Sequence, residues 1–217
     1  QKCSAASRAY IPASLWPATR DQILDMLADV VPGDVTDFSC QVNAVIDEKA
    51  FDTIMGYINR AREVPGTEII TGGRGDKSKG WFIEPTVIVT PDPHSVTMEE
   101  EIFGPVMTIY VYPDDKYSET LAICDATSPY GLTGSIFSND KYAMIEACRK
   151  LRYAAGNFYI NDKPTGAMVG QQPFGGSRAS GTNDKAGSYL NLTRWVSPRT
   201  VKETLIPVTG FRYPYMD

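Results

Sequence analysis

Two stretches of the chain repeat their apolar residues at the spacing of an amphipathic α-helix. The first covers residues 23–30, and Pro32 with the following glycine ends its pattern. The second covers residues 51–58, with Asp47 upstream as the expected N-cap, and it ends near Pro65. Apolar residues three and four positions apart line one face of a helix. The sequence therefore predicts two helices, each with one face buried.

Short runs rich in β-branched and aromatic residues alternate with the helical patterns and predict strands. These runs are residues 67–71, 82–90, 106–112, 132–137 and 157–160. The last three are separated by two further helical patterns, at residues 115–124 and 144–151. An alternation of strand and helix implies right-handed crossovers and parallel strands. We predict an α/β fold with a mostly parallel sheet and flanking helices.

The last part of the chain has a different pattern. Residues 166–187 are rich in glycine and have too little apolar periodicity for a regular element, so we interpret them as a long functional loop. A short amphipathic helix is expected at residues 189–195 and a β-prone segment at residues 200–206, ahead of an aromatic tail. The Gly72-Gly73-Arg74-Gly75 stretch lacks the third glycine of a dinucleotide loop and is interpreted as a turn.

Charge and hydropathy exclude some classes of partner. The formal charge is -5 at pH 7, with basic residues interspersed among acids, and binding to DNA or RNA requires a basic face. Nucleic acid is therefore not expected as a partner. The longest apolar runs are far shorter than the roughly 20 residues that cross a bilayer, so no membrane span is expected. The first residues lack a signal-peptide core and an initiator Met, and we interpret the N-terminus as a cut.

Cysteine and histidine usage limits the chemistry further. The four cysteines form no C-x-x-C pair, and His94 is the only histidine, so no metal site is expected. A Ser-His-Asp hydrolase is disfavoured because His94 follows a proline in a polar connection. Cys124 and Cys148 fall on apolar helical faces, where a small buried thiol is commoner than a disulfide. A reducing compartment is favoured.

Cys3 differs from the other cysteines because it lies among small polar residues near the start of the chain. Four motifs follow it, in this order: E-E-I-F-G-P at 100–105, Y-G-L-T-G-S-I-F at 130–137, G-N-F-Y-I-N at 156–161 and P-F-G-G-S at 173–177. Each motif alone is weak. As an ordered set after Gln1-Lys2-Cys3, they make the whole chain resemble the aldehyde dehydrogenase superfamily.

Finer features resemble the pyrroline-5-carboxylate (glutamate semialdehyde) dehydrogenase branch of that superfamily. They lie at residues 111–117, 156–163, 169–172 and 178–184. The resemblance implies NAD-dependent oxidation of L-glutamate γ-semialdehyde to glutamate, a step of proline catabolism. In its eukaryotic form this branch is mitochondrial, so the resemblance implies the mitochondrial matrix, although the chain itself shows no targeting segment.

The resemblance assigns roles to individual residues. Cys3 is the expected nucleophile, whose thiolate adds to the aldehyde and passes through a thiohemiacetal and a thioester. Glu101 is expected to bond the nicotinamide ribose of NAD and to be the acid that points inward. Phe103 is expected to pack beside the nicotinamide, because an aromatic wall limits where the ring can lie.

The substrate contacts implied by the resemblance lie in two segments. The hydroxyl of Ser4 and the backbone N–H groups of Gly166 and Ala167 are expected to hold the substrate carboxylate, since backbone donors suit a carboxylate and glycine permits close approach. Phe174 is expected to wall the aliphatic stem of the substrate. Considered alone, Phe174 is equally consistent with a packed loop aromatic, and the other two loop residues with an ordinary turn.

The family pattern also divides the chain and places parts of the enzyme outside it. Residues 1–187 are expected to form the catalytic domain, and residues 188–217 a C-terminal helix, oligomerisation strand and tail. In the superfamily the NAD-binding Rossmann domain, the general-base glutamate and the oxyanion asparagine lie upstream of the nucleophile. We therefore expect this fragment to bind NAD poorly and to be weakly active or inactive alone, while the intact enzyme forms a homodimer or higher homo-oligomer.

Two alternatives remain open from the sequence. The chain could be a non-catalytic assembly module that acts through residues 200–206, because an unpaired edge strand readily binds a partner. It could also belong to an aldehyde dehydrogenase that acts on a different semialdehyde, such as succinate semialdehyde.

Overall fold

The computed structural model describes residues 1–216. Its strands are β1 Arg8–Pro12, β2 Glu68–Thr71, β3 Gly75–Asp76, β4 Phe82–Ile83, β5 Thr86–Thr90, β6 Val106–Tyr112, β7 Tyr130–Gly131, β8 Thr133–Ile136, β9 Asn157–Ile160 and β10 Ser177–Arg178. Its helices are α1 Trp16–Ala28, α2 Glu48–Glu63, α3 Val96–Glu99, α4 Tyr117–Ala126, α5 Lys141–Lys150 and α6 Tyr189–Leu192, with 3₁₀ turns η1 Asp114–Lys116 and η2 Pro214–Met216.

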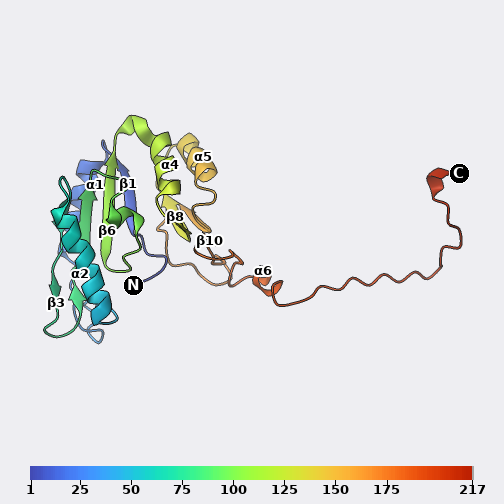
Figure 1. Cartoon of the computed structure of the whole chain (residues 1–217), viewed down its shortest axis with the longest axis horizontal. Coiled ribbons are helices and arrows are strands. Elements are labelled where there is room, and N and C mark those ends of the chain that lie inside the picture. Colours follow the sequence, from blue (N-terminus) through green and yellow to red (C-terminus); the bar gives the residue numbers. More distant parts are fainter. Residues whose placement is uncertain (217) are drawn as a thin grey trace.

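A four-stranded sheet in the order β1-β6-β5-β2 forms the centre of the molecule (Figure 1). Strand β6 pairs in parallel with both β1 and β5, and only β2 runs antiparallel to its neighbour. Strands β8 and β9 form a separate parallel pair. The prediction of an α/β fold with mostly parallel strands is confirmed. The hydrogen bonds divide the strands between this sheet and smaller two-stranded pairs.

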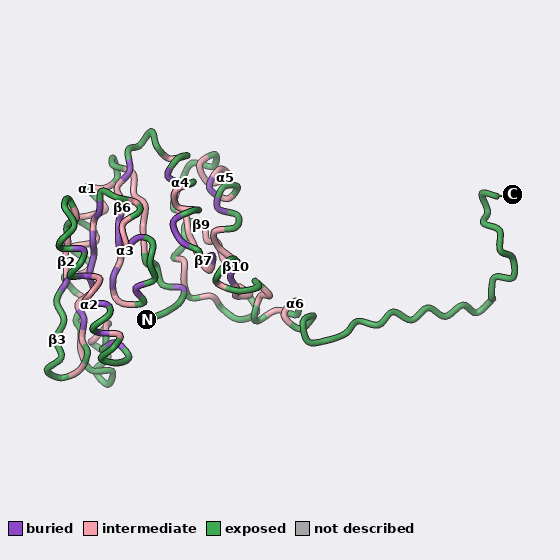
Figure 2. Tube along the Cα trace, viewed as in Figure 1, coloured by how far each residue is buried: buried purple, intermediate pink, exposed green. Residues whose placement is uncertain are grey.

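The main core lies between α2 and the four-stranded sheet. Asp47 caps α2 as predicted, and its carboxylate accepts from the Ala50 N–H at 2.7 Å. Phe51, Ile54 and Ile58 repeat at helical spacing and are buried, together with Ile88 of β5 and other sheet residues. Burial of each such side chain contributes about 1.5–3 kcal/mol. Figure 2 shows these buried positions in the sheet and along α2.

A second, smaller core joins the helices that follow β6 to the parallel pair. Leu121 of α4 packs with Ala147 of α5 and with Leu151, and Ile136 of β8 and Phe158 of β9 lie against them. This cluster holds the β8–β9 pair beside the rest of the molecule. Cys124 and Cys148 lie on α4 and α5 as free thiols, and burial raises the pKa of the Cys124 thiol.

Several boundaries differ from the prediction for local physical reasons. Helix α1 begins at Trp16, earlier than the apolar repeat suggested, because Pro17 fits the first turn of a helix. The run at 82–90 is divided into β4 and β5, since Pro85 has no N–H for a ladder bond. Strand β1 had not been predicted. The stretch interpreted as a turn is an irregular connection with positive φ at Gly72 and Gly73, and its last residue, Gly75, already belongs to β3.

The C-terminal part extends away from the body of the molecule (Figure 1). Helix α6 covers only residues 189–192 of the predicted 189–195. Residues 200–206 are exposed and form no strand in the single chain. No helix within residues 1–216 is both long and apolar enough to cross a membrane.

Candidate active site

Cys3 lies at the corner of a tight turn at the N-terminal end of β1. The Ala5 N–H donates to the Lys2 carbonyl at 3.2 Å and closes the turn. The Cys3 residue is exposed, whereas Ser4 beside it is buried. Cys3 is therefore open to solvent before the first residue of β1, and Ser4 beside it is packed inside. This is the geometry that a nucleophile needs to meet a substrate.

The E-x-F-G-P motif and Cys3 lie at the same end of the central sheet, because each precedes the first residue of a parallel strand. Strands β1 and β6 are parallel, with Arg8 opposite Thr108, and Cys3 and Phe103 each precede this pair by five residues. Gln1 and Phe103 also line one cavity of about 270 Å³. Gln1, two residues before Cys3, thus lies beside the same cavity as Phe103, although about 100 residues separate the two in sequence.

Within this motif the two neighbouring acids have different surroundings. Glu100 accepts a hydrogen bond from the Tyr57 hydroxyl of α2, and this bond raises the pKa of Tyr57. Glu101 is exposed, so the inward orientation expected for it is not seen within this chain. Phe103 is 41% exposed and has a φ of 57°, a left-handed conformation that is costly for a residue with a side chain.

The predicted substrate loop is tied directly to the turn that carries Cys3. The hydroxyl of Ser4 lies 2.9 Å from that of Thr165, which immediately precedes Gly166. Gly166 has a φ of 84°, which only glycine adopts without strain, and Ala167 is half-buried. The Thr133 hydroxyl at the start of β8 donates to the Ser4 carbonyl at 3.4 Å. Three motifs therefore meet around Ser4.

Phe174 is half-buried and its backbone is fixed on both sides. Its N–H donates to the Ala186 carbonyl at 2.8 Å, and the Ala186 N–H donates back at 2.7 Å. The side-chain amide of Asn157 donates to the Pro173 carbonyl at 3.2 Å and accepts from the Gly175 N–H at 3.2 Å. The predicted long loop is thus ordered, and hydrogen bonds to the backbone of residues 173–175 hold Phe174 in place.

The base of this loop is packed backbone against backbone. A Cβ on Gly156 would lie 1.9 Å from the Gly175 carbonyl oxygen, so only glycine fits there. The ammonium of Lys185 donates to the Gly156 carbonyl, and burial lowers the pKa of this lysine. Arg178 donates to both the backbone and the carboxylate of Asp125 at 2.6 Å, which joins the loop to the end of α4.

The structure therefore joins two of the predicted site residues to sequence neighbours of the others, and the roles of all of them stay predictions. Ser4, next to Cys3, meets the segment before Gly166, and Phe103 shares a cavity with Gln1. Three residues that position the loop had not been singled out: Thr165, Asn157 and Lys185. For Thr165 the available signal was its place directly before Gly166, and for Asn157 it was its place inside the G-N-F-Y-I-N motif.

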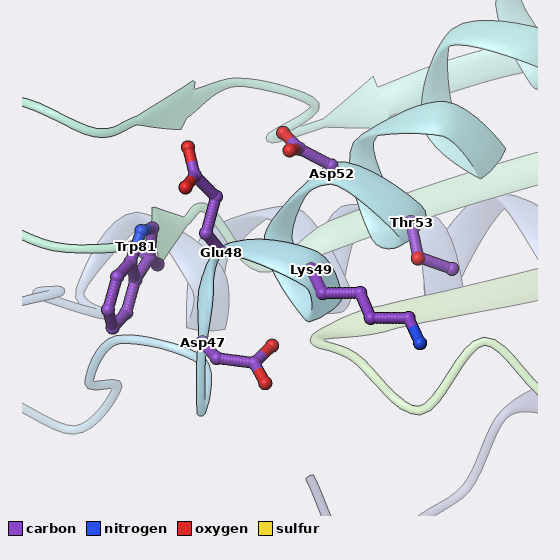
Figure 3. A pocket seen from close by; sticks show the side chains of 6 residues that line it. All are labelled: Asp47, Glu48, Lys49, Asp52, Thr53 and Trp81. Carbon is purple, nitrogen blue, oxygen red and sulfur yellow. The ribbon is translucent and has the colours of Figure 1, made fainter.

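A larger cavity, of about 610 Å³, lies at the start of α2 and contains none of the predicted site residues (Figure 3). Its lining residues are Asp47, Glu48, Lys49, Asp52, Thr53 and Trp81. Lys77 pairs with Glu48 at 2.9 Å and with Asp52 at 2.7 Å, so these acids are already neutralised. The described residues contain no cluster of three or more His, Cys, Asp or Glu side chains that could hold a metal ion.

Comparisons with known proteins find relatives along most or all of this chain. The sequence model of the aldehyde dehydrogenase family matches residues 1–201. The mitochondrial delta-1-pyrroline-5-carboxylate dehydrogenase of Dictyostelium discoideum is 62% identical over 216 residues, and the human mitochondrial protein of the same name is 52% identical over 217 residues. Both alignments cover 100% of this chain.

A solved structure gives the same relationship. The Mycobacterium tuberculosis delta-pyrroline-5-carboxylate dehydrogenase bound with NAD superimposes with a TM-score of 0.84 at 47% identity, and the match covers 100% of this chain and 39% of that one. This chain also spans 39% of the D. discoideum relative and 38% of the human one. It therefore corresponds to well under half of each of these proteins.

Proposed function

The chain belongs to the aldehyde dehydrogenase family, and we propose that it is the thiol-bearing portion of an NAD-dependent pyrroline-5-carboxylate dehydrogenase. The proposed substrate is L-glutamate γ-semialdehyde and the product is glutamate. In this proposal residues 1–187 form the catalytic domain and residues 188–217 the C-terminal extension. The identity to relatives of that name, 62% and 52%, supports the choice of branch.

One observation carries the proposal: an exposed cysteine whose neighbour is hydrogen-bonded to the substrate loop. Cys3 is exposed, and the Ser4 hydroxyl lies 2.9 Å from Thr165, one residue before Gly166. An aldehyde bound by its carboxylate at the loop would therefore present its carbonyl near the sulfur. Positioning of this kind accelerates a reaction by converting an encounter into an intramolecular step.

The chemistry of this chain begins with the Cys3 sulfur. The thiolate adds to the aldehyde carbon, a carbon–sulfur bond forms, and the carbonyl oxygen takes up a proton to give a thiohemiacetal. Once the carbon has lost its hydride and the hydroxyl its proton, Cys3 holds the substrate as a thioester. Water then breaks the carbon–sulfur bond, which releases the carboxylic acid and returns the thiol. One difficult oxidation is thereby divided into two easier steps.

Glu101 and Phe103 of the E-x-F-G-P motif have chemistry that suits the nicotinamide end of NAD. Glu101 is an exposed carboxylate that is able to accept hydrogen bonds from ribose hydroxyls. Phe103 is a 41% exposed aromatic held in a left-handed conformation at the rim of the cavity it shares with Gln1. NAD, when bound, supplies the acceptor for the hydride. Glu101 and Phe103 are the residues of this chain that we assign to holding it.

The carboxylate of the substrate is assigned to Ser4 and to the backbone of the loop. Gly166 has a left-handed backbone conformation that glycine adopts without strain, and the N–H groups of Gly166 and Ala167 are the proposed donors. Phe174, fixed through its backbone, is the proposed wall for the aliphatic stem. Hydrogen bonds to a carboxylate are about twice as strong as neutral ones, so a few donors suffice to orient the substrate.

A chimeric enzyme tests this proposal. This chain replaces the matching part of the D. discoideum relative, to which it is 62% identical, and NADH production is followed with glutamate γ-semialdehyde and with succinate semialdehyde. We expect activity that is faster with glutamate γ-semialdehyde and that Cys3→Ala abolishes, whereas Cys40→Ala leaves it unchanged. Undiminished activity of the Cys3→Ala chimera overturns the proposal, and preference for succinate semialdehyde overturns the substrate.

The exposed C-terminal extension favours a second role, in assembly. Val201, Leu205 and Ile206 are 74%, 88% and 85% exposed in the single chain, and their sequence is β-prone. Exposed apolar residues of this kind mark an interaction site. We assign residues 200–206 to a strand that pairs with another copy of the chain in a homo-oligomer. The mitochondrial names of the relatives support a place in the mitochondrial matrix.

A further inference from the structure

We infer that Asn157 is a positioning residue that sets aldehyde selectivity by fixing the backbone on both sides of Phe174. This inference rests on the proposed function, because it gives Phe174 a substrate to select. Asn157 is the first residue of β9, and its side chain leaves the strand to bind the loop that carries the aromatic wall.

The contact is a two-point clamp. The Asn157 amide nitrogen donates to the Pro173 carbonyl and its amide oxygen accepts from the Gly175 N–H, each at 3.2 Å. One side chain thus binds the residues immediately before and after Phe174. An amide is suited to this because it carries a donor and an acceptor in one plane. A carboxylate would satisfy only the Gly175 N–H, and an apolar side chain neither.

The position of the clamp in the strand fixes its orientation. The backbone of Asn157 is paired with Thr133 in the β8–β9 register, and its N–H donates to the Leu132 carbonyl at 3.0 Å. The preceding residue, Gly156, lies directly against Gly175. Asn157 is therefore held by a hydrogen-bonded strand and by the backbone contact of the residue before it. Its amide fixes the loop relative to the β8–β9 pair.

The backbone of Phe174 itself is hydrogen-bonded to Ala186, further along the same loop. The paired hydrogen bonds between Phe174 and Ala186, at 2.8 and 2.7 Å, hold its own N–H and C=O. These bonds join two parts of the same loop, and Lys185 ties that loop to the Gly156 carbonyl. Within residues 1–216, Asn157 is the one side chain of β9 that hydrogen-bonds to the residues on either side of Phe174. Loss of this amide should therefore move the aromatic ring without unfolding the strands.

Displacement of the wall should affect selectivity more than reactivity. The rate at which Cys3 reacts with a small reagent depends on the turn at residues 2–5, which Asn157 does not contact in the described hydrogen bonds. Recognition of a carbon chain depends on the wall, and a shift of about 1 Å in a positioning group costs up to about 100-fold. With the wall displaced, a longer aldehyde should no longer bind at lower concentrations than a short one.

The test measures protection of Cys3 in the chimeric enzyme described above, with the unsubstituted chain as the parent. Iodoacetamide alkylation of Cys3 is followed by peptide mass spectrometry in the presence of glutamate γ-semialdehyde or propanal. In the parent chain we expect glutamate γ-semialdehyde to protect Cys3 at concentrations at least about tenfold lower than propanal, the size of effect that a few pocket contacts provide. In Asn157→Ala this ratio should approach one, with the alkylation rate in the absence of aldehyde unchanged.

A second variant and a control distinguish loss of the Asn157 contacts from loss of folding. Asn157→Asp keeps the acceptor for the Gly175 N–H and should retain an intermediate ratio. Asn139→Ala removes an exposed asparagine and should match the parent. Amide hydrogen exchange should show faster exchange at Gly175 in Asn157→Ala, while the Asn161 N–H, which donates to the Ile136 carbonyl directly after β9, stays protected.

The outcomes separate this inference from the proposed function. If neither aldehyde protects Cys3 in the parent chimera, the proposed function fails and this inference with it. If the parent discriminates between the aldehydes and Asn157→Ala discriminates equally well, the inference alone is overturned. A ratio that falls in Asn157→Ala while Asn139→Ala keeps the parent value supports it.

Discussion

The hydroxyl oxygens of Ser4 and Thr165 lie 2.9 Å apart although 161 residues separate them in the sequence. Ser4 follows the proposed nucleophile, and Thr165 precedes Gly166 of the proposed substrate loop. The contact therefore couples the place where the covalent bond forms to the place where the substrate is held. It is also a contact between two small polar side chains that no local sequence pattern announces.

Replacement of Thr165 by Val should weaken this coupling with little change of shape. The substitution leaves the buried Ser4 hydroxyl without its partner, and an unsatisfied buried hydroxyl costs about 1–3 kcal/mol. We expect urea denaturation to show a fall of that size in the free energy of unfolding. Thr53→Val, at an exposed position on α2, should change it by less than about 0.5 kcal/mol. Equal values for the two variants would contradict the assigned contact.

The close approach of Gly156 and Gly175 predicts a larger effect from a single methyl group. In Gly156→Ala the new Cβ would meet the Gly175 carbonyl oxygen at 1.9 Å, so the loop must move, at a cost of about 1–3 kcal/mol. Gly56→Ala is the matched control, because its Cβ has nothing within 4 Å and a helix interior gains about 0.5–1 kcal/mol from this change. Thermal unfolding should therefore shift in opposite directions, and shifts of the same sign would refute the packing.

The sequence predicted the elements whose signals are local. Helix α2 has both a capping side chain at Asp47 and an apolar stripe that repeats every three to four residues, so its start and its buried face followed directly. The strands β5, β6 and β9 are rich in β-branched and aromatic residues and were predicted for that reason. The alternation of these strands with helices was sufficient for the α/β class.

The features that were missed depend on partners far away in the sequence. Strand β1 starts with Arg8, ends with Pro12 and is half-buried throughout, so it lacks a clear alternation and forms because β6 is available beside it. The clamp from Asn157 to the loop around Phe174 is likewise invisible until the chain is folded. The motifs contain the candidate residues of the site, whereas the residues that position them are identified only by their contacts in the folded chain.

The tyrosine that joins α4 to α5 predicts how stability changes at alkaline pH. Burial raises the pKa of Tyr117 to about 12 from an ordinary value of 10.0, and its hydroxyl donates to the Ala143 carbonyl at 2.8 Å. Between these two values the unfolded chain releases this proton and the folded chain retains it, so the folded state loses stability as pH rises.

Removal of the Tyr117 hydroxyl should flatten that dependence. The free energy of unfolding of Tyr117→Phe, measured by urea denaturation between pH 9 and about 12, should fall less steeply than that of the parent. It should also be lower at neutral pH by about 1 kcal/mol, because the hydrogen bond to α5 is lost. Tyr142→Phe, at a position 84% exposed on α5, should keep the parent slope. The assignment fails if Tyr117→Phe and the parent have the same slope.

The exposed apolar residues of the C-terminal extension predict a change in assembly rather than in folding. Ile206 is 85% exposed in the single chain, so Ile206→Lys should leave the thermal unfolding midpoint of the monomer unchanged while it places a charge in the proposed intermolecular strand, where burial without a partner is costly. Light scattering after size exclusion should report a lower mass for Ile206→Lys than for the parent. Val35→Lys, at a loop position 70% exposed, should keep the parent mass. The same mass for all three proteins would exclude residues 200–206 from the interface, because a lysine in a paired, buried strand cannot remain hydrated.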